Sequence, residues 1–471
     1  MKPSPSLRHA PHPVRRSLLA LVVVPALACA TAVIPAGAAE AAPDATTTDP
    51  SVYVDPLVGT SNAGNTHPGA VTPFGMLTWG PDESFYNGPT SGSNTGRGTM
   101  RTPSPSGYEY GSNSIRGFSL THVSGAGCTG LSGDIPFMPW SGDVEVSPST
   151  ADATGAAFRS TFSHSEESAS PGRYSVLLDS GVGVDLAATT RTGSGHFTYP
   201  EERSATMLVR TSDSLVGSSD ADITIDAASR TISGSVTSGN FCGPFTGDGI
   251  LQRSYYTLHF VAEFDTDFAS VGTWTDGQLK AGSTEASGGT GYTGGLGTNG
   301  SAANGYPPAG KGSGGWVTFA GHDVNVRVGI SYVSEDNARA NLTAENPRGT
   351  TVDTIAASAR AAWNRELGRV DIGGGTSDER VTFYTALYHS MLHPNVTSDS
   401  NGEYTGFDLA THTVSQGQAA QYATFSGWDV YRSQVQLVTL LDPERGSDIA
   451  ESLLNQADQN GGVWDRWTHN S

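Results

Sequence analysis

Cysteine and positive charge are both scarce in this sequence of 471 residues. Its three cysteines allow one disulfide at most, which excludes a small disulfide-stapled domain. Lysine and arginine number 26 against 46 aspartates and glutamates, so the formal net charge is −20. A surface this acidic repels nucleic acid and anionic lipid. We therefore expect no nucleic-acid partner, whereas neutral partners such as sugars suit the charge.

Long apolar runs are also lacking, except near the N-terminus. Arg8, Arg15 and Arg16 precede residues 18–32, which are almost wholly apolar, and small residues follow. This pattern is typical of a secretory signal peptide, here residues 1–41. No later segment reaches the ~18 apolar residues of a membrane-spanning helix. The sequence predicts a secreted, extracellular protein without a membrane span.

Two cysteines remain after the predicted signal peptide, Cys128 and Cys242. In an oxidising compartment they could form one long-range disulfide. Alternatively, each thiol lies in its own glycine-rich loop near a site. Their spacing does not decide between the two interpretations.

Common catalytic motifs are missing as well. The sequence has no nucleophile elbow of a Ser-His-Asp triad, no phosphate-binding glycine loop, no HExxH and no EF-hand loop. Taken one motif at a time, the residues therefore indicate what kind of site the protein has, but they do not identify a reaction.

Glycine is abundant, with 59 residues, and short apolar or alternating runs separated by turns fill residues 51–335. Residues 174–179, 255–264 and 324–333 are examples of such runs. Several of them predict antiparallel sheets packed as a β-sandwich. We interpret the low-complexity stretch 282–315 as a surface loop within this domain, because a strand pattern follows it.

The pattern becomes helical after Asp336. Apolar residues at helical spacing predict a helix within the linker 336–375, and Thr376 with Glu379 forms a capping box that begins the next helix. Further helices are expected over 430–441, stopped by Pro443, and over 447–459. So few helices leave little room for a core of their own.

The loop at residues 54–82 and three later motifs carry the polar and aromatic residues that suit a site. The loop is long, rich in glycine and proline, and includes His67, Trp79 and Asp82. We interpret it as a rigid loop at a binding surface. His122 ends an apolar run, and a lone histidine is more often structural than catalytic. With no second histidine or carboxylate pair near it in sequence, zinc is not expected.

The sharpest local motif is Ser426–Gln434. Trp428 offers an apolar face for a sugar ring, Asp429 offers two acceptors for a vicinal diol, and Arg432 could hold Asp429 by a salt bridge. Alternatively, the segment is only a helix N-terminus with Asp429 near its positive end. A second aromatic and charged cluster at residues 461–467 lines a cleft or packs between helices.

Together these motifs closely resemble glycoside hydrolase family 92, the exo-acting α-mannosidases. The resemblance runs from residue 54 to 467 through VDPLVGT, GNTHPGAVTPFGM, GYEY, IRGFSLTHVSGAGC, GDIPFMP, NFCG, FYTALYHSMLHPN, GWDVYRSQ and LLDP. It implies a multidomain β + α architecture: an N-terminal antiparallel β-sandwich, a linker helix and an (α/α)6 toroid. Residues 376–471 would then be the incomplete start of that catalytic toroid.

The resemblance also implies the chemistry. Family members release terminal α-linked mannose with inversion and need Ca2+, which contacts O2 and O3 of the sugar. The acid, a glutamate, and the base, an aspartate, are expected beyond Ser471, so no catalytic residue and no metal ligand is assigned here. The isolated chain is accordingly expected to be inactive.

Four residues match glycone-facing positions of the family: Trp428, Asp429, Phe241 and Cys242. A substrate contact by Cys242 would disfavour a disulfide with Cys128. The implied substrates are mannose-containing N-glycans or mannans, with an expected α-1,2 linkage, although family members differ in linkage. The alternative function is a non-catalytic protein that binds mannose or other glycans through the same loops.

Overall fold

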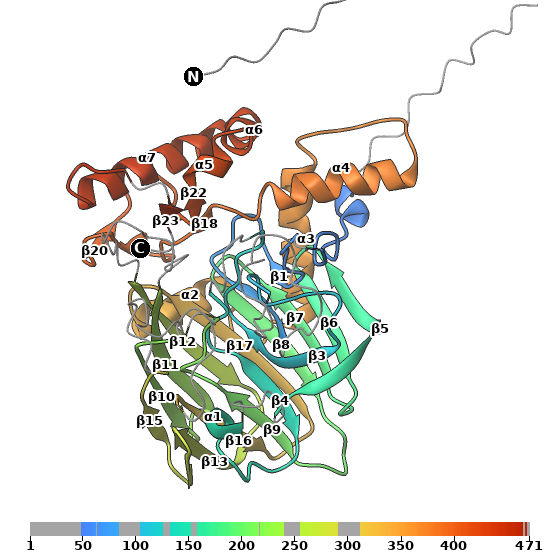
Figure 1. Cartoon of the computed structure of the whole chain (residues 1–471), viewed down its shortest axis with the longest axis vertical. Helices are drawn as coiled ribbons and strands as arrows, with labels where there is room; N and C mark the ends of the chain where they lie inside the picture. The colour runs from blue at the N-terminus through green and yellow to red at the C-terminus, as the bar shows by residue number, and fades with distance from the viewer. Residues whose placement is uncertain are drawn as a thin grey trace, which may run out of the picture. The chain divides into compact units, whose positions relative to one another are not determined.

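A computed structural model shows how the chain folds (Figure 1). Of the two units that its contacts define, Met1–Asp44 lies outside the described residues, and Ala45–Ser471 is a compact unit. The segment with Phe241 and Cys242 is also outside, as is Cys128. The described residues are 49–62, 64–83, 104–125, 132–151, 158–215, 217–239, 255–290, 311–464 and 467–468.

The strands form where apolar and polar side chains alternate. In β10 (Asp220–Asp226) every second side chain is buried, with Ile223 and Ile225 inside and their neighbours in solvent. β17 (Asp323–Ser331) alternates in the same way over its first half. Alternate side chains of a strand point to opposite faces, so such a pattern requires a sheet with one face against a core.

Two antiparallel sheets result, and β5 joins them by pairing with both β6 and β3. The first sheet has the spatial order β15 (Glu285–Ser287), β10, β11 (Thr231–Gly239), β12 (Tyr255–Phe264), β17, β8 (Thr192–Thr198), β7 (Gly183–Ala188), β6 (Arg173–Leu178), β5 (Ser160–Ser170). The second has the order β14 (Gln278–Ala281), β13 (Phe268–Thr275), β16 (Ser313–Phe319), β9 (Ala205–Val209), β4 (Phe137–Ser141), β3 (Ser114–Ser119), β2 (Thr78–Glu83), β1 (Ala70–Val71).

Aromatic rings from both sheets fill the space between them. The Trp79 ring of β2 lies 5.9 Å from Phe137 of the same sheet and 6.4 Å from Phe197 of the other. Gly193 and Gly195 make room for the indole, since a Cβ at either position would lie under 3 Å from a Trp79 ring atom. Trp79 is thus a core residue of the sandwich, and our interpretation of it as part of a binding surface is wrong.

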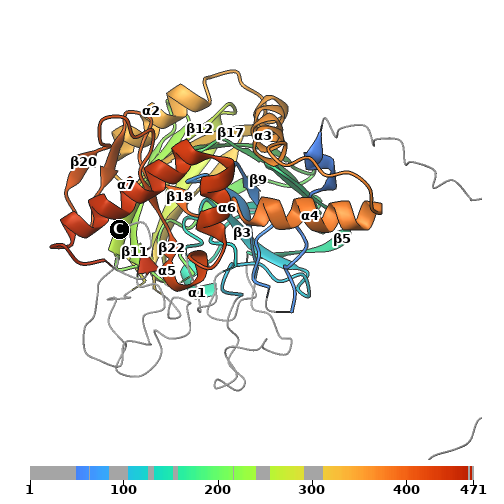
Figure 2. The ribbon, with the colours of Figure 1, turned by 90° about the horizontal axis from the view of Figure 1, so that it is seen from above.

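The described helices comprise one before the sandwich strands, one between β4 and β5, and six after β17. They are η1 (Pro50–Tyr53), α1 (Pro148–Ala151), α2 (Glu335–Glu345), α3 (Val352–Leu367), α4 (Ser377–His389), α5 (Gly427–Val430), α6 (Gln434–Leu441) and α7 (Pro443–Gln459), and Figure 2 shows α6 and α7 side by side. Short strand pairs link them: β18 (Asn395–Val396) with β21 (Tyr422–Ala423), β19 (Glu403–Thr405) with β20 (Thr411–Thr413), and β22 (Phe425–Ser426) with β23 (Trp467–Thr468).

The order of a β-sandwich followed by a linker helix and further helices confirms the predicted fold class. α3 covers the predicted apolar stripe, and α4 begins at Thr376 with the capping box formed. A second core joins the helices to the N-terminal loop: it includes Phe74 together with Trp363 of α3 and Tyr388 of α4, whose rings lie 4.3 Å apart.

Three expectations about local structure are wrong. Residues 54–82, interpreted as one loop, are only partly a loop, because β1 and most of β2 lie within them. The helix expected over 430–441 is divided into α5 and α6, since Ser433 adopts an extended φ of −157°. The helix expected over 447–459 begins earlier, because Pro443 opens α7 in a first-turn position where its missing N–H would have no helical partner. α6 ends at Leu441, as expected.

Candidate functional site

The short helix α5 presents Asp429, one of the residues predicted to contact a sugar. Asp429 is exposed in the first turn, and its carboxylate accepts a hydrogen bond from the Ser426 hydroxyl. A carboxylate can accept from two neighbouring hydroxyls. The Arg432 guanidinium lies over the Tyr431 ring, 5.6 Å from its centroid.

β22 and β23 bring two of the sequence motifs together. Ser426 pairs with Trp467, so the segment that ends in residues 461–467 runs beside the start of α5. Trp464 is exposed by 59% and Val463 by 55%. The pairing thus brings the end of the second motif to the start of α5. The backbone of Trp428 lies in α5.

A polar chain ties the sandwich to the segment before α6. His393 Nε2 lies 3.0 Å from the Ser124 carbonyl oxygen, and the Ser124 hydroxyl accepts from the His67 N–H at 2.9 Å. Gln434, the first residue of α6, donates to the His393 carbonyl at 2.6 Å. Burial lowers the pKa of His393, although its contacts with Asn395 and Ser124 oppose this. These contacts fix where α6 begins.

Beneath Ser124, two histidines and one aspartate form a buried cluster. The His67 and His122 rings stack with centroids 3.5 Å apart. His122 Nε2 lies 3.0 Å from Asp82 Oδ1, and its Nδ1 lies 3.0 Å from the Thr78 carbonyl oxygen. We expected His122 to have no second histidine nearby, and this is wrong, because His67 lies against it in the folded chain. The strand register that makes these contacts is not readable from local spacing.

His67 is neutral in this cluster. Its Nδ1 accepts from the Gly69 N–H at 3.1 Å, so the proton resides on Nε2 and is donated to the Pro81 carbonyl at 3.0 Å. Burial, and then the neighbouring His122, hold the pKa of His67 well below its usual value. The cluster has no described opening to solvent, since His67, Asp82 and His122 are all buried. We assign it to positioning the loop.

The carboxyl groups of Glu83, Glu109 and Glu167 form a second cluster beside the histidine cluster. Burial raises the pKa of Glu83 well above its usual value, and the charges of Glu109, Glu167 and Asp82 add to this. Glu167 accepts hydrogen bonds from the Tyr108 and Tyr174 hydroxyls at 2.9 and 2.7 Å. These partners make the group a packed network of the sandwich interior.

Two family models match the chain. The glycosyl hydrolase family 92 N-terminal domain matches residues 53–331, and the glycosyl hydrolase family 92 catalytic domain matches residues 337–471. The chain belongs to glycosyl hydrolase family 92. Most of the predicted sandwich and all of the helical segment are covered by these two matches.

Solved structures of the family are similar to this chain over most of its length. The family 92 α-mannosidase BT3965 from Bacteroides thetaiotaomicron is 28% identical, with a TM-score of 0.72 over 90% of this chain and 51% of its own. The inverting mannosidase BT2199 from the same organism is 25% identical, with a TM-score of 0.68 over 89% of this chain and 50% of its own.

A curated relative from Arthroderma benhamiae is an uncharacterized secreted glycosidase, 25% identical over 373 residues. The match covers 75% of this chain and 42% of that protein. The chain thus spans about half the length of the solved relatives that it matches, and less than half of this one. None of the helices in the described part of the chain combines the length and apolar character needed to cross a bilayer.

The part of the chain that the structure describes does not show a calcium site. Within the described ranges, no three His, Cys, Asp or Glu side chains are grouped to hold a metal ion. The buried Asp399 has its oxygens occupied by Ser331, Asn337 and Asn341. Phe241 and Cys242 lie outside the described residues, as does the side chain of Trp428, so their predicted sugar contacts stay predictions.

Proposed function

We propose that this protein acts outside the cell on glycans that end in α-linked mannose, such as N-glycans or mannans. The proposed activity is release of the mannose with inversion. The observation that carries the proposal is the match of both family 92 domains along one chain. The mannosidases named above, one of which is solved with mannoimidazole bound, support the choice of sugar. The secreted relative supports the location.

The proposed glycone contacts are Asp429 and Trp428 from α5, with Phe241 and Cys242 from the sandwich. Asp429 would accept from two neighbouring hydroxyls of the mannose, and Trp428 would cover a ring face. Asp429 is exposed at the N-terminus of a short helix, which supports the first of these roles. The expected substrate linkage is α-1,2.

An inverting mechanism needs an acid and a base, with carboxyls roughly 6.5–9.5 Å apart, to protonate the leaving oxygen and activate a water. We assign neither role to a residue of this chain. From the family resemblance we propose that the isolated chain is inactive and that its glycone contacts bind mannosides. The calcium requirement is proposed from the family resemblance alone.

Calorimetric titration of the 471-residue chain with α-1,2-mannobiose, with and without calcium, tests this proposal. We expect the mannobiose to bind and the matched α-1,2-glucobiose to bind more weakly, because the two differ in the orientation of O2. Mannose release is measured in the same samples. Release would place an acid and a base within these residues, and failure to bind either disaccharide would contradict the proposed contacts.

A further inference from the structure

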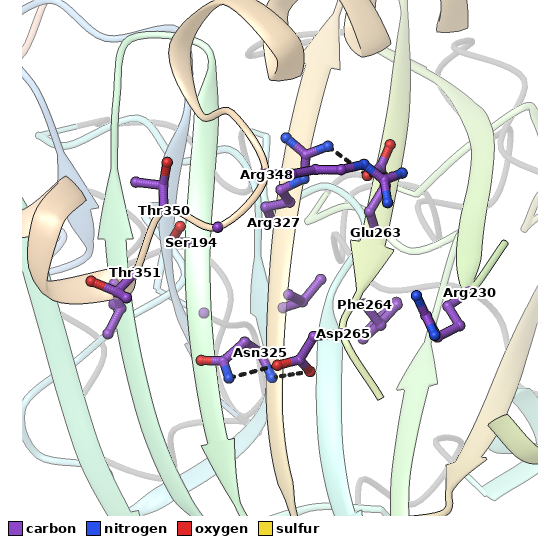
Figure 3. Close-up of a pocket in the computed structure, with 14 residues that line it drawn as sticks. Ser194, Arg230, Glu263, Phe264, Asp265, Asn325, Arg327, Arg348, Thr350 and Thr351 are labelled. Atoms are coloured by element: carbon purple, nitrogen blue, oxygen red, sulfur yellow. Dashed lines mark hydrogen bonds and ion pairs between the residues drawn. The ribbon is translucent and has the colours of Figure 1, made fainter. Parts of the chain in front are cut away.

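A hollow of about 400 Å³ lies on the outer face of the first sheet, where β8, β12 and β17 meet the loop between α2 and α3 (Figure 3). This volume is in the range of small-molecule sites. None of its lining residues belongs to α5, α6 or α7. We call it the Arg348 hollow; its lining includes Ser194, Arg230, Glu263, Asp265, Asn325, Arg327, Arg348 and Thr350.

One side of the Arg348 hollow carries an excess of positive charge. Glu263 is buried, and its Oε2 pairs with Arg327 Nη2 at 2.6 Å and with Arg348 Nη2 at 2.7 Å. Arg339 adds a third guanidinium, 3.7 Å from Oε1. A single carboxylate faces three guanidinium groups, in a protein whose net charge is −20. This concentration of arginine is unusual for so acidic a chain.

Arg348 and Arg230 have donors left to offer. The Arg348 side chain is 69% exposed, so most of its guanidinium faces solvent at the rim. Arg230 donates to Asp267 through Nη1 at 2.9 Å, but its Nε–H is buried and has no hydrogen-bond partner among the described residues. A buried donor without an acceptor is costly, and an anion in the hollow would supply the acceptor.

The opposite side suits hydroxyl groups. Asn325 uses its N–H and its Nδ2 on Asp265, at 2.9 and 2.8 Å, which leaves Asn325 Oδ1 as an acceptor. Ser194 accepts from Asn346 at 3.0 Å, so its own proton is available. Figure 3 shows Arg327 and Arg348 above Asn325 and Asp265, with Ser194 and Thr350 to their left.

We propose that the Arg348 hollow binds a sugar that carries an anionic substituent. The anion, a phosphate or a carboxylate, contacts the guanidinium of Arg348, and the hydroxyls of the ring meet Asn325 and Ser194. Guanidinium binds both anions by paired hydrogen bonds, so phosphate and carboxylate share this chemistry. The site is separate from α5 and does not depend on the proposed mannoside activity.

Calorimetric titration of the full chain with glucose 6-phosphate, glucuronate, glucose and inorganic phosphate tests the proposal. These gluco-configured probes avoid the mannose site. We expect at least one anionic sugar to bind more tightly than both glucose and phosphate; the one that binds tells phosphate from carboxylate. Arg348→Ala should weaken this binding by about tenfold or more, as expected for loss of a charged hydrogen bond.

Arg339→Ala is the matched control, because Arg339 faces the same Glu263 but does not line the hollow. It should keep the wild-type affinity, and both variants should keep the wild-type Tm, since Arg327 still pairs with Glu263 in each. Equal weakening by the two variants would show general attraction to positive charge and overturn the proposal. So would binding of neither anionic sugar, or binding of inorganic phosphate as tight as that of the sugars.

Discussion

At the residue scale, the buried carboxyl of Glu83 shows how burial sets protonation. Its Oε1 accepts from the Glu109 N–H at 2.6 Å, and burial raises its pKa well above the usual value. The folded protein therefore keeps a proton on Glu83 at a pH where the unfolded chain has lost it. Stability is full below the unfolded pKa of about 4.3 and falls as pH rises towards the folded pKa, by about 1.4 kcal/mol per pH unit.

Replacement of Glu83 by Gln should remove this loss, since the amide keeps the acceptor and cannot ionise. We expect the free energy of unfolding of Glu83→Gln to exceed that of the wild type increasingly as pH rises from 5 towards 8. Urea unfolding at several pH values measures it. Glu202→Gln, at an exposed site, is the control and should follow the wild type. Parallel curves for the wild type and Glu83→Gln would show that Glu83 is already ionised in the folded state.

The residues of these buried clusters were visible in the sequence, but their contacts were not. His67 and Asp82 belong to the loop motif and His122 to a later one, 40 positions from Asp82. They meet because β2 pairs with β3 in a register that places Asp82 opposite Gly117. Local spacing carries no information on that register, so we judged His122 to be isolated.

At the element scale, α2 lies on the sheet because β17 has a glycine beneath it. A Cβ at Gly329 would lie 2.3 Å from the Ala338 carbonyl oxygen and 2.9 Å from Leu342 Cβ. Ala338 and Leu342 pack on Val261 of β12. The close approach of this helix to the sheet depends on the missing side chain.

Gly329→Ala should therefore push α2 from the sheet and cost about 1–3 kcal/mol, the usual range for overpacking. Gly321→Ala is the matched control, because a Cβ there would meet its nearest neighbour, Thr266, at an ordinary 3.5 Å. The midpoints of guanidinium unfolding compare the two. A Gly329→Ala protein as stable as Gly321→Ala would mean that the helix does not rest on this glycine.

Sequence patterns predicted some elements and missed others for identifiable reasons. α3 and α4 were predictable because α3 carries a regular apolar stripe and Thr376 and Glu379 cap α4. α2 was missed because only Ala338 and Leu342 of its apolar residues are buried, which is too few for a clear period.

At the scale of the whole molecule, Asp399 joins the sandwich to the helical segment. Its carboxylate is buried and accepts from Ser331 of β17 at 2.7 Å, and from Asn337 and Asn341 of α2 at 2.8 and 2.6 Å. Burial raises the pKa of Asp399, and these three hydrogen bonds oppose the rise. One carboxylate thus satisfies three donors from the sandwich and its first helix.

Removal of that carboxylate in Asp399→Ala should leave these donors unsatisfied and cost at least about 2 kcal/mol. Scanning calorimetry should show the loss as a lower Tm for the protein, because the carboxylate is shared by both parts. Asp458→Ala, on the exposed face of α7, should leave the Tm unchanged. If the two variants melt alike, Asp399 does not contribute to holding the parts together.

The central claim is that α5 contributes to a site shaped for the reacting form of a mannose ring. The measurement that tests it most directly is the affinity of the chain for mannoimidazole, whose fused ring flattens the sugar, relative to mannose. An enzyme-derived site should prefer the flattened ring, and Asp429→Ala should weaken that binding by about tenfold or more, with Asp458→Ala as control. Preference for mannose itself, or an unchanged affinity in Asp429→Ala, would contradict the account.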